Sequence, residues 1–86
     1  MNIALYEQRV KKVMSNVFGI DESLITGDAS QDTITNWNSL GHMNLVIALE
    51  EEFSITFRDE QVIEMLSYPL IICTLKERMT EMEHKT

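Results

Sequence analysis

The sequence predicts a small all-α bundle of three main helices and one short helix, with a long loop between the first two main helices. Two observations support this fold class. Apolar residues recur at three- and four-residue spacing over three long segments, the period of a helix with one buried face. Strand-like alternation is weak throughout. Because 86 residues suffice for one domain, we expect residues 1–86 to form a single unit.

The first helix is expected from about Ile3 to Phe18. Gly19 follows it as a natural C-terminal stop, because glycine readily adopts the left-handed conformation that ends a helix. The apolar positions form one face, which we expect to pack against the rest of the bundle. They are Ile3, Tyr6, Val10, Val13, Met14 and Val17.

A long polar connection follows, from Ile20 to Trp37. Loops of this length in small domains are usually functional or held by anchors. We expect a short helical turn at residues 21–24. The segment 28–39 does not fit a calcium loop, because its sixth position is Thr33 rather than Gly and its twelfth is Ser39 rather than Glu. The expected apolar anchors are Ile20, Leu24, Ile25, Ile34 and Trp37.

The segment from Ser39 to Phe53 is the strongest helix signal. Asn38 precedes it and is a good N-cap residue, since its side chain accepts from free N–H groups of the first turn. One side of this helix suits the core. A second stripe, at i, i+3 and i+7, we expect to stay partly exposed. The core residues are Leu45, Val46, Leu49 and Phe53, and the stripe is Leu40, Met43 and Ile47.

Two further helices complete the bundle. A short one is expected from about Asp59 to Leu66, and a longer one from about Pro69 to Met82, because proline is tolerated in a first helical turn. We expect Cys73 to be a small buried hydrophobe in the last helix. The buried face of that helix is expected at Ile71, Ile72, Leu75, Met79 and Met82.

The distribution of charge along the chain limits the classes of partner that it can bind. The net charge is −7, and residues 21–64 hold ten acidic residues and one base, Arg58, for a local charge of −9. Such a surface argues against nucleic acid and anionic membranes and favours basic protein partners. The alternative is that the charge only keeps a small protein in solution.

Cysteine content and the start of the chain bear on the compartment. Cys73 is the one cysteine, so no intrachain disulfide is possible. The first residues lack the charged and apolar regions of a signal peptide, and no stretch has the length of a membrane span. We expect a monomer in the cytoplasm.

Ser39 is the main candidate for a functional residue. It lies in the first turn of the predicted helix 39–53, where backbone N–H groups lack intrahelical partners and the helix dipole is positive. A phosphate on its hydroxyl would lie in a favourable field. The alternative from this local pattern alone is a plain serine that helps to begin a helix.

Residues 38–53, NSLGHMNLVIALEEEF, resemble the signature segment of acyl carrier proteins. Residues 8–13, 18–20 and 55–60 resemble flanking parts of the same family, so the resemblance covers roughly residues 6 to 82. It implies a phosphopantetheine arm on Ser39, installed by a phosphopantetheinyl transferase, and no catalysis by the domain itself. It also implies that acyl or aminoacyl groups travel on the arm as thioesters, in fatty-acid, polyketide or other specialised biosynthesis.

The resemblance further implies a docking face on the helix after Ser39. Enzymes with basic, apolar patches would bind it. The matching positions in this chain are Leu40, Met43, Ile47, Glu50 and Glu51. A related hypothesis is that the bundle opens to shelter an apolar cargo between its last three helices.

The chain departs from fatty-acid carriers at three places. Asn38 stands where an Asp usually precedes the serine, which removes a charge that the transferase often reads. Gly41 and Asn44 occupy positions that are commonly acidic, and residues 36–37, Asn-Trp, replace a small step that contains glycine. These departures favour a dedicated carrier for a specialised pathway.

Two other functions stay open. A helical interaction module without an arm would bind a basic partner through the helix 39–53. A hydrolase would use Ser39 with His42, three residues later on the same helix face, but no orienting group or oxyanion loop is recognisable. We expect His42 to be an exposed histidine beside the arm.

Overall fold

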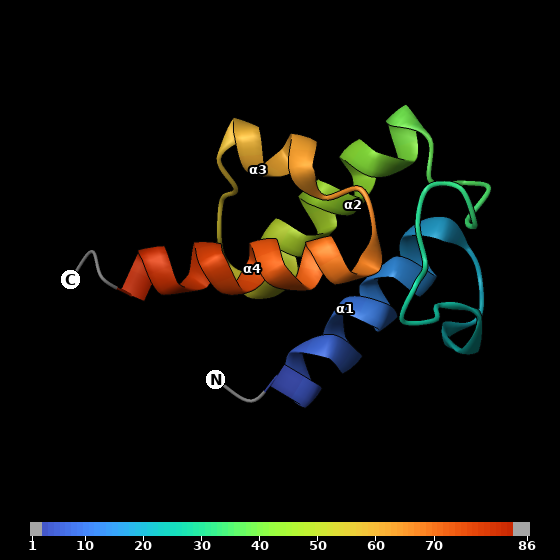
Figure 1. Cartoon of the computed structure of the whole chain (residues 1–86), viewed down its shortest axis with the longest axis horizontal. Coiled ribbons are helices and arrows are strands. Elements are labelled where there is room, and N and C mark those ends of the chain that lie inside the picture. Colours follow the sequence, from blue (N-terminus) through green and yellow to red (C-terminus); the bar gives the residue numbers. More distant parts are fainter. Residues whose placement is uncertain (1–2, 84–86) are drawn as a thin grey trace.

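Four α-helices and one 3₁₀ turn build the molecule, as the computed structural model of residues 3–83 shows (Figure 1). The helices are α1 (Ile3–Phe18), α2 (Ser39–Phe53), α3 (Asp59–Glu64) and α4 (Tyr68–Glu83), and the 3₁₀ turn η1 covers Glu22–Leu24. Within this range no strand forms, although an isolated antiparallel bridge pairs Ser30 with Ser67. The all-α prediction, with one short helix and a long first loop, is confirmed.

The helix ends follow from local chemistry. Gly19 adopts a φ of 67°, and its N–H donates to the Ser15 carbonyl at 2.9 Å, so α1 ends where the sequence predicts. Ser54 ends α2 with a φ of 54°. The prediction for α3 was two residues too long, because Met65 leaves the helical region with φ −81° and ψ 65°. α4 begins at Tyr68, one residue before the predicted start.

One apolar core joins α1, α2 and α4. The most deeply buried apolar side chains are at most 1% exposed, and they come from α1, α2 and α4, from the long loop and from the segment after α3. They include Val10, Met14, Leu45, Leu49, Met65, Ile71 and Leu75. The predicted faces of α1 and α4 are thus confirmed in their central residues. Tyr6, Val17, Met79 and Met82 are partly buried and pack against this core, and the side chain of Ile3 lies outside the described residues.

The loop between α1 and α2 is held by apolar anchors. Ile25, Ile34 and Trp37 are buried at 2–5% exposure, and Ile20 is partly buried against the core. The prediction for Leu24 was wrong, since this side chain is 64% exposed. Leu24 and Ile25 are consecutive at the end of the tight turn η1, so they point to different sides and only Ile25 reaches the core.

Cys73 was also predicted wrongly, because its thiol is exposed. Each residue of an α-helix is rotated by about 100° from the last, so a helix with 3.6 residues per turn cannot bury a long consecutive run against one neighbour. In α4 the buried positions 71, 72, 74 and 75 flank residue 73 on both sides. They turn Cys73 toward solvent.

A polar network fastens α3 to α4. Arg58, just before α3, forms ion pairs with Glu77 at 3.2 Å and Glu81 at 2.9 Å. Gln61 is fully buried, accepts from the Arg58 backbone N–H and donates to Glu77 at 2.8 Å. These bonds fix the direction of a helix that is only six residues long. Among residues 3–83, none of the helices has the length and apolar character needed to cross a membrane.

Candidate functional site

Ser39 lies exposed in the first turn of α2, as the sequence predicts. The side-chain oxygen of Asn38 accepts from the Gly41 N–H at 2.9 Å, and the His42 N–H donates to the Asn38 carbonyl at 2.7 Å to open the helical ladder. These bonds satisfy the third and fourth N–H groups. Those of Ser39 and Leu40 precede the ladder, at the positive end of the helix dipole. An anion on the Ser39 hydroxyl would therefore be stabilised.

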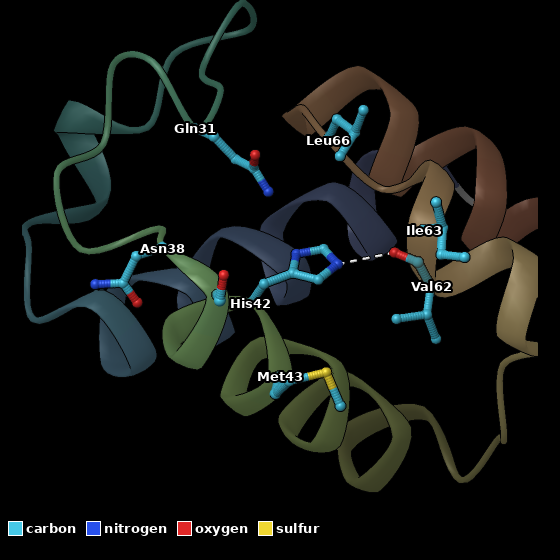
Figure 2. Close-up of a pocket in the computed structure, with 8 residues that line it drawn as sticks. Gln31, Asn38, His42, Met43, Val62, Ile63 and Leu66 are labelled. Atoms are coloured by element: carbon cyan, nitrogen blue, oxygen red, sulfur yellow. Dashed lines mark hydrogen bonds between the residues drawn. The ribbon is translucent and has the colours of Figure 1, made fainter.

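Ser39 borders a groove between the start of α2 and α3. The groove has a volume of about 530 Å³. In Figure 2 the Gln31 side chain extends from the long loop on one side, while Ile63 and Leu66 lie on the opposite side. Its lining residues are Gln31, Asn38, Ser39, His42, Met43, Val62, Ile63 and Leu66. A group attached to Ser39 thus has a largely apolar surface directly beside it.

His42 spans this groove instead of standing free in solvent. Its Nδ1 accepts from the Trp37 indole N–H at 3.0 Å, and its Nε2 lies 2.8 Å from the Val62 carbonyl oxygen. Because a carbonyl only accepts, Nε2 carries the proton and Nδ1 does not. The expectation of an exposed histidine was wrong, since Trp37 before the helix and Val62 on α3 draw the ring inward and leave it half-buried.

The same bonds bear on the Ser39–His42 pair. A general base needs a free ring nitrogen within hydrogen-bond reach of the serine hydroxyl. Both nitrogens of His42 are already occupied, by Trp37 and by Val62. In this arrangement His42 has no nitrogen with which to take the Ser39 proton.

Exposed apolar side chains follow Ser39 along α2 and continue across the groove in α3 and just after it. The predicted stripe is confirmed as exposed, with Leu40 at 72%, Met43 at 50% and Ile47 at 52%. Ile63 and Leu66 extend it across the groove, at 71% and 50%. We use "apolar patch" below for Leu40, Met43, Ile47, Ile63 and Leu66. Exposed apolar side chains that gather on one side of a molecule are a candidate interaction surface.

The acidic residues at the end of α2 have different roles. Glu50 is half-buried, and its carboxylate accepts from the Phe57 backbone N–H at 2.9 Å. Glu52 pairs with Arg9 at 2.8 Å, while Glu51 is exposed. We expected both Glu50 and Glu51 on the docking face. Glu51 is exposed and open to a partner, whereas the Glu50 carboxylate is engaged in a hydrogen bond to the Phe57 backbone.

Several residues of the site were not singled out from the sequence. Ile63 and Leu66 were missed, although apolar residues three apart, one within the short helix and one just after it, are a signal that would have found them. Gln31 and Val62 carry no such signal. Val62 acts through its backbone carbonyl, and Gln31 reaches the groove only because the long loop folds back.

No protein-family model matches this chain. Within residues 3–83, no group of three or more His, Cys, Asp or Glu side chains is placed to hold a metal ion.

Proposed function

We propose that this protein is an acyl carrier protein that bears a phosphopantetheine arm on Ser39. The observation that carries the proposal is the exposed Ser39 hydroxyl at the N-terminus of α2, beside a groove of about 530 Å³. The resemblance of residues 38–53 to the signature of that family supports the same assignment. An acyl or aminoacyl group would travel on the arm as a thioester.

The attachment reaction is a phosphoryl transfer performed by a partner transferase. The Ser39 oxygen attacks the phosphorus of coenzyme A that bears the pantetheine. A new P–O bond forms, the diphosphate P–O bond breaks, and adenosine 3′,5′-bisphosphate leaves. The serine proton is lost to a base of the transferase. The resulting phosphodiester keeps one negative charge near the N–H groups of Ser39 and Leu40, where the helix dipole favours it.

The apolar patch and Glu51 supply the proposed docking face. Exposed Met43 is adaptable and suits contact with several partners. Glu51 lies on the same helix face as Ile47, four residues along α2. A partner enzyme with an apolar surface and a nearby Lys or Arg fits this arrangement. Effective concentration, not catalysis by the domain, would be the carrier's contribution. We propose the cytoplasm as its location.

The test is intact mass after incubation with coenzyme A and a broad-specificity phosphopantetheinyl transferase. We expect the gain of one phosphopantetheine, and no gain in Ser39→Ala. Ser23→Ala is the matched control, because Ser23 is an exposed serine in the turn η1, away from the groove. Modification that persists in Ser39→Ala would contradict the proposal.

Asn38 gives a second arm of the same test. If the wild type gains no mass, Asn38→Asp restores the charge usual before the serine and keeps an N-cap. Modification of this variant would point to a dedicated transferase for the natural sequence. Failure of both proteins would count against the carrier function.

The apolar patch also favours a second candidate, an interaction module that never carries an arm. Such a module would keep its partner in Ser39→Ala and lose it in Ile47→Lys or Glu51→Lys. A carrier would bind its enzymes through the same face but would fail to deliver cargo without Ser39. Binding and loading measured on the same three variants separate the two functions.

A further inference from the structure

His42 joins three parts of the molecule beside Ser39. Its backbone belongs to the first turns of α2, its Nδ1 bonds Trp37 at the end of the long loop, and its Nε2 bonds Val62 of α3. Trp37 is itself fixed, at 2% exposure, with its ring 5.4 Å from that of Phe18. The imidazole is therefore held at both edges, by the buried Trp37 ring on one side and by the backbone of α3 on the other.

The hydrogen bond from His42 gives a partner to a backbone carbonyl of α3. The last four carbonyls of any α-helix lack an intrahelical partner, and in a six-residue helix Val62 is among them. Val62 is half-buried, so water reaches its carbonyl only in part. The His42 Nε2–H supplies the missing donor and links α2 to α3 directly (Figure 2).

Behind this link lies the packed interior. Leu45, Leu49 and Met65 are fully buried, and Leu75 is 1% exposed. A chain that entered the bundle from Ser39 would have to part α2 from α3. That movement breaks the His42–Val62 bond and leaves a partly buried donor and a partly buried acceptor without each other, which is unfavourable.

In front of the link lies the groove. Its volume of about 530 Å³ falls within the range of roughly 300–1,000 Å³ found for small-molecule sites. Its walls are apolar at Met43, Ile63 and Leu66, while Gln31 and His42 add polar atoms. A short or polar group has enough surface here. The apolar walls are themselves 50–71% exposed, so a long alkyl chain lying along them would keep one side in contact with water and gain less from burial than in the core.

We propose that the Trp37–His42–Val62 hydrogen-bond chain closes the bundle interior next to Ser39, so that a group carried on Ser39 stays in the surface groove. The cargo class that follows is a short acyl or aminoacyl group. His42 acts as a positioning residue, through α3, and does not touch the reacting atoms. This inference rests on the proposed carrier function, and the sheltering of a long chain in the core is the alternative that the experiment tests.

The test attaches the cargo chemically, so that it does not depend on a transferase. The protein is the full-length double variant Ser39→Cys and Cys73→Ser. The second substitution removes the exposed thiol of Cys73, which would otherwise react with the probe. The thiol at position 39 is then alkylated with a bromoacetyl probe that carries a spacer of pantetheine length. The spacer ends in an acetyl or a decanoyl group. Methyl chemical shifts of Ile63 and Leu66 report the groove, and those of Leu49 and Leu75 report the interior.

We expect both probes to move the Ile63 and Leu66 signals and the two forms to share their Leu49 and Leu75 shifts. Interior shifts that change with the decanoyl probe alone would overturn the proposal. Because the probe is attached without an enzyme, this result is independent of the mass experiment. If the mass experiment shows no transferred arm, that result counts against the carrier function. It does not change what the chemical-shift experiment says about the position of the attached probe.

Two variants of His42 distinguish closure of the interior by the His42–Val62 hydrogen bond from a general packing role of the side chain. In His42→Asn the shorter side chain still meets Trp37 but does not reach Val62, whereas the longer amide of His42→Gln keeps a donor for Val62. We expect the decanoyl probe to shift Leu49 and Leu75 in His42→Asn and to shift them far less in His42→Gln. Equal shifts of Leu49 and Leu75 in the two variants would show that the His42–Val62 hydrogen bond does not close the interior, and would overturn the proposal.

Trp37→Phe serves if His42→Asn is poorly folded by circular dichroism. It keeps an aromatic ring against Phe18 and removes the indole N–H that fixes the imidazole. We expect a decanoyl-dependent interior shift between those of wild type and His42→Asn. Interior shifts that match the wild type would contradict the proposal.

Discussion

The backbone oxygen of Asn36 lies 2.1 Å from the position that a Cβ atom on Gly41 would occupy. The Asn36 carbonyl carbon and the Phe18 ring would follow at 3.2 and 3.3 Å. The start of α2 is therefore pressed against the end of the long loop, and glycine is needed for space at this helical position. Asn36 is held there by its amide, which donates to the Phe18 carbonyl at 2.8 Å.

Gly41→Ala is expected to destabilise the fold. Alanine normally improves a helix interior by roughly 0.5–1 kcal/mol over glycine. Here the methyl group meets backbone atoms, so we expect the free energy of unfolding to fall by about 1–3 kcal/mol. Urea unfolding measures it, with Gly27→Ala as the control, because a Cβ there meets nothing within 4 Å. A Gly41→Ala protein as stable as the wild type would refute this packing.

Glu50 and Glu51 are expected to differ in their effect on stability. Glu50 bonds the Phe57 N–H, so Glu50→Ala should lower the free energy of unfolding by about 1–3 kcal/mol. Glu51→Ala should change it by no more than about 0.5 kcal/mol. Chemical denaturation of both variants checks the difference, and Glu50→Gln, which retains an acceptor, should recover most of the loss. Equal effects at 50 and 51 would argue against the structural role of Glu50.

Tyr68→Phe is expected to be neutral or stabilising. In the described part of the chain the Tyr68 hydroxyl is buried without a hydrogen-bond partner, while its ring packs at 6% exposure. Removing an unsatisfied hydroxyl and keeping the ring should raise the free energy of unfolding by about 1 kcal/mol or leave it unchanged. Thermal unfolding tests this against Tyr6→Phe, whose ring is only partly buried. A clear loss of stability would reveal a partner for the hydroxyl.

The same tyrosine predicts a loss of stability in alkali. Burial, aided by the negative charge of Glu7, raises the pKa of Tyr68 from 10.0 to about 12. The folded state thus holds the phenol proton more tightly than the unfolded state. The contribution is complete below pH 10 and is lost as the pH rises toward 12. Unfolding across this range, compared with Tyr68→Phe, should give a steeper fall for the wild type, and parallel curves would contradict it.

Glu81 predicts a loss of stability in acid. Desolvation acts to raise its pKa, but hydrogen bonds and charge from Arg58 and Arg78 outweigh this and lower the pKa below the ordinary 4.5. The folded state therefore favours the carboxylate, and the resulting stability is present above pH 4.5 and lost as the pH falls through the lowered pKa. We expect Glu81→Gln to lose less stability than the wild type between neutral and acid pH. Identical pH profiles would show that the Arg58 network contributes nothing.

Much of the fold follows from local pattern. The apolar period set the main helices within one residue of their observed bounds, and Gly19 and Asn38 marked two of their ends. The exposure of the Leu40, Met43 and Ile47 stripe also followed from helical spacing. These features depend on residues close together in the chain, which is why the sequence predicts them.

The errors come from contacts with other elements and from the direction in which a turn or a helix presents its side chains. The burial of His42 depends on Val62, 20 residues away, and the engagement of Glu50 depends on the backbone of Phe57. Leu24 and Cys73 fit an apolar pattern, but the direction of a tight turn and the rotation of α4 against the core turn them outward. Whether each of these side chains is buried or exposed depends on the neighbours that pack against it. The local sequence pattern does not contain that information.

The six-residue length of α3 has a consequence for dynamics. A helix this short is not stable alone in water, since nucleation costs more than a few hydrogen bonds return. It exists here because the residues around it hold both its ends. Amide hydrogen exchange should therefore be faster in α3 than in the centre of α2. A ligand that binds across Ile63 and Leu66 would slow that exchange, so α3 offers a built-in reporter of occupancy for any partner of this surface.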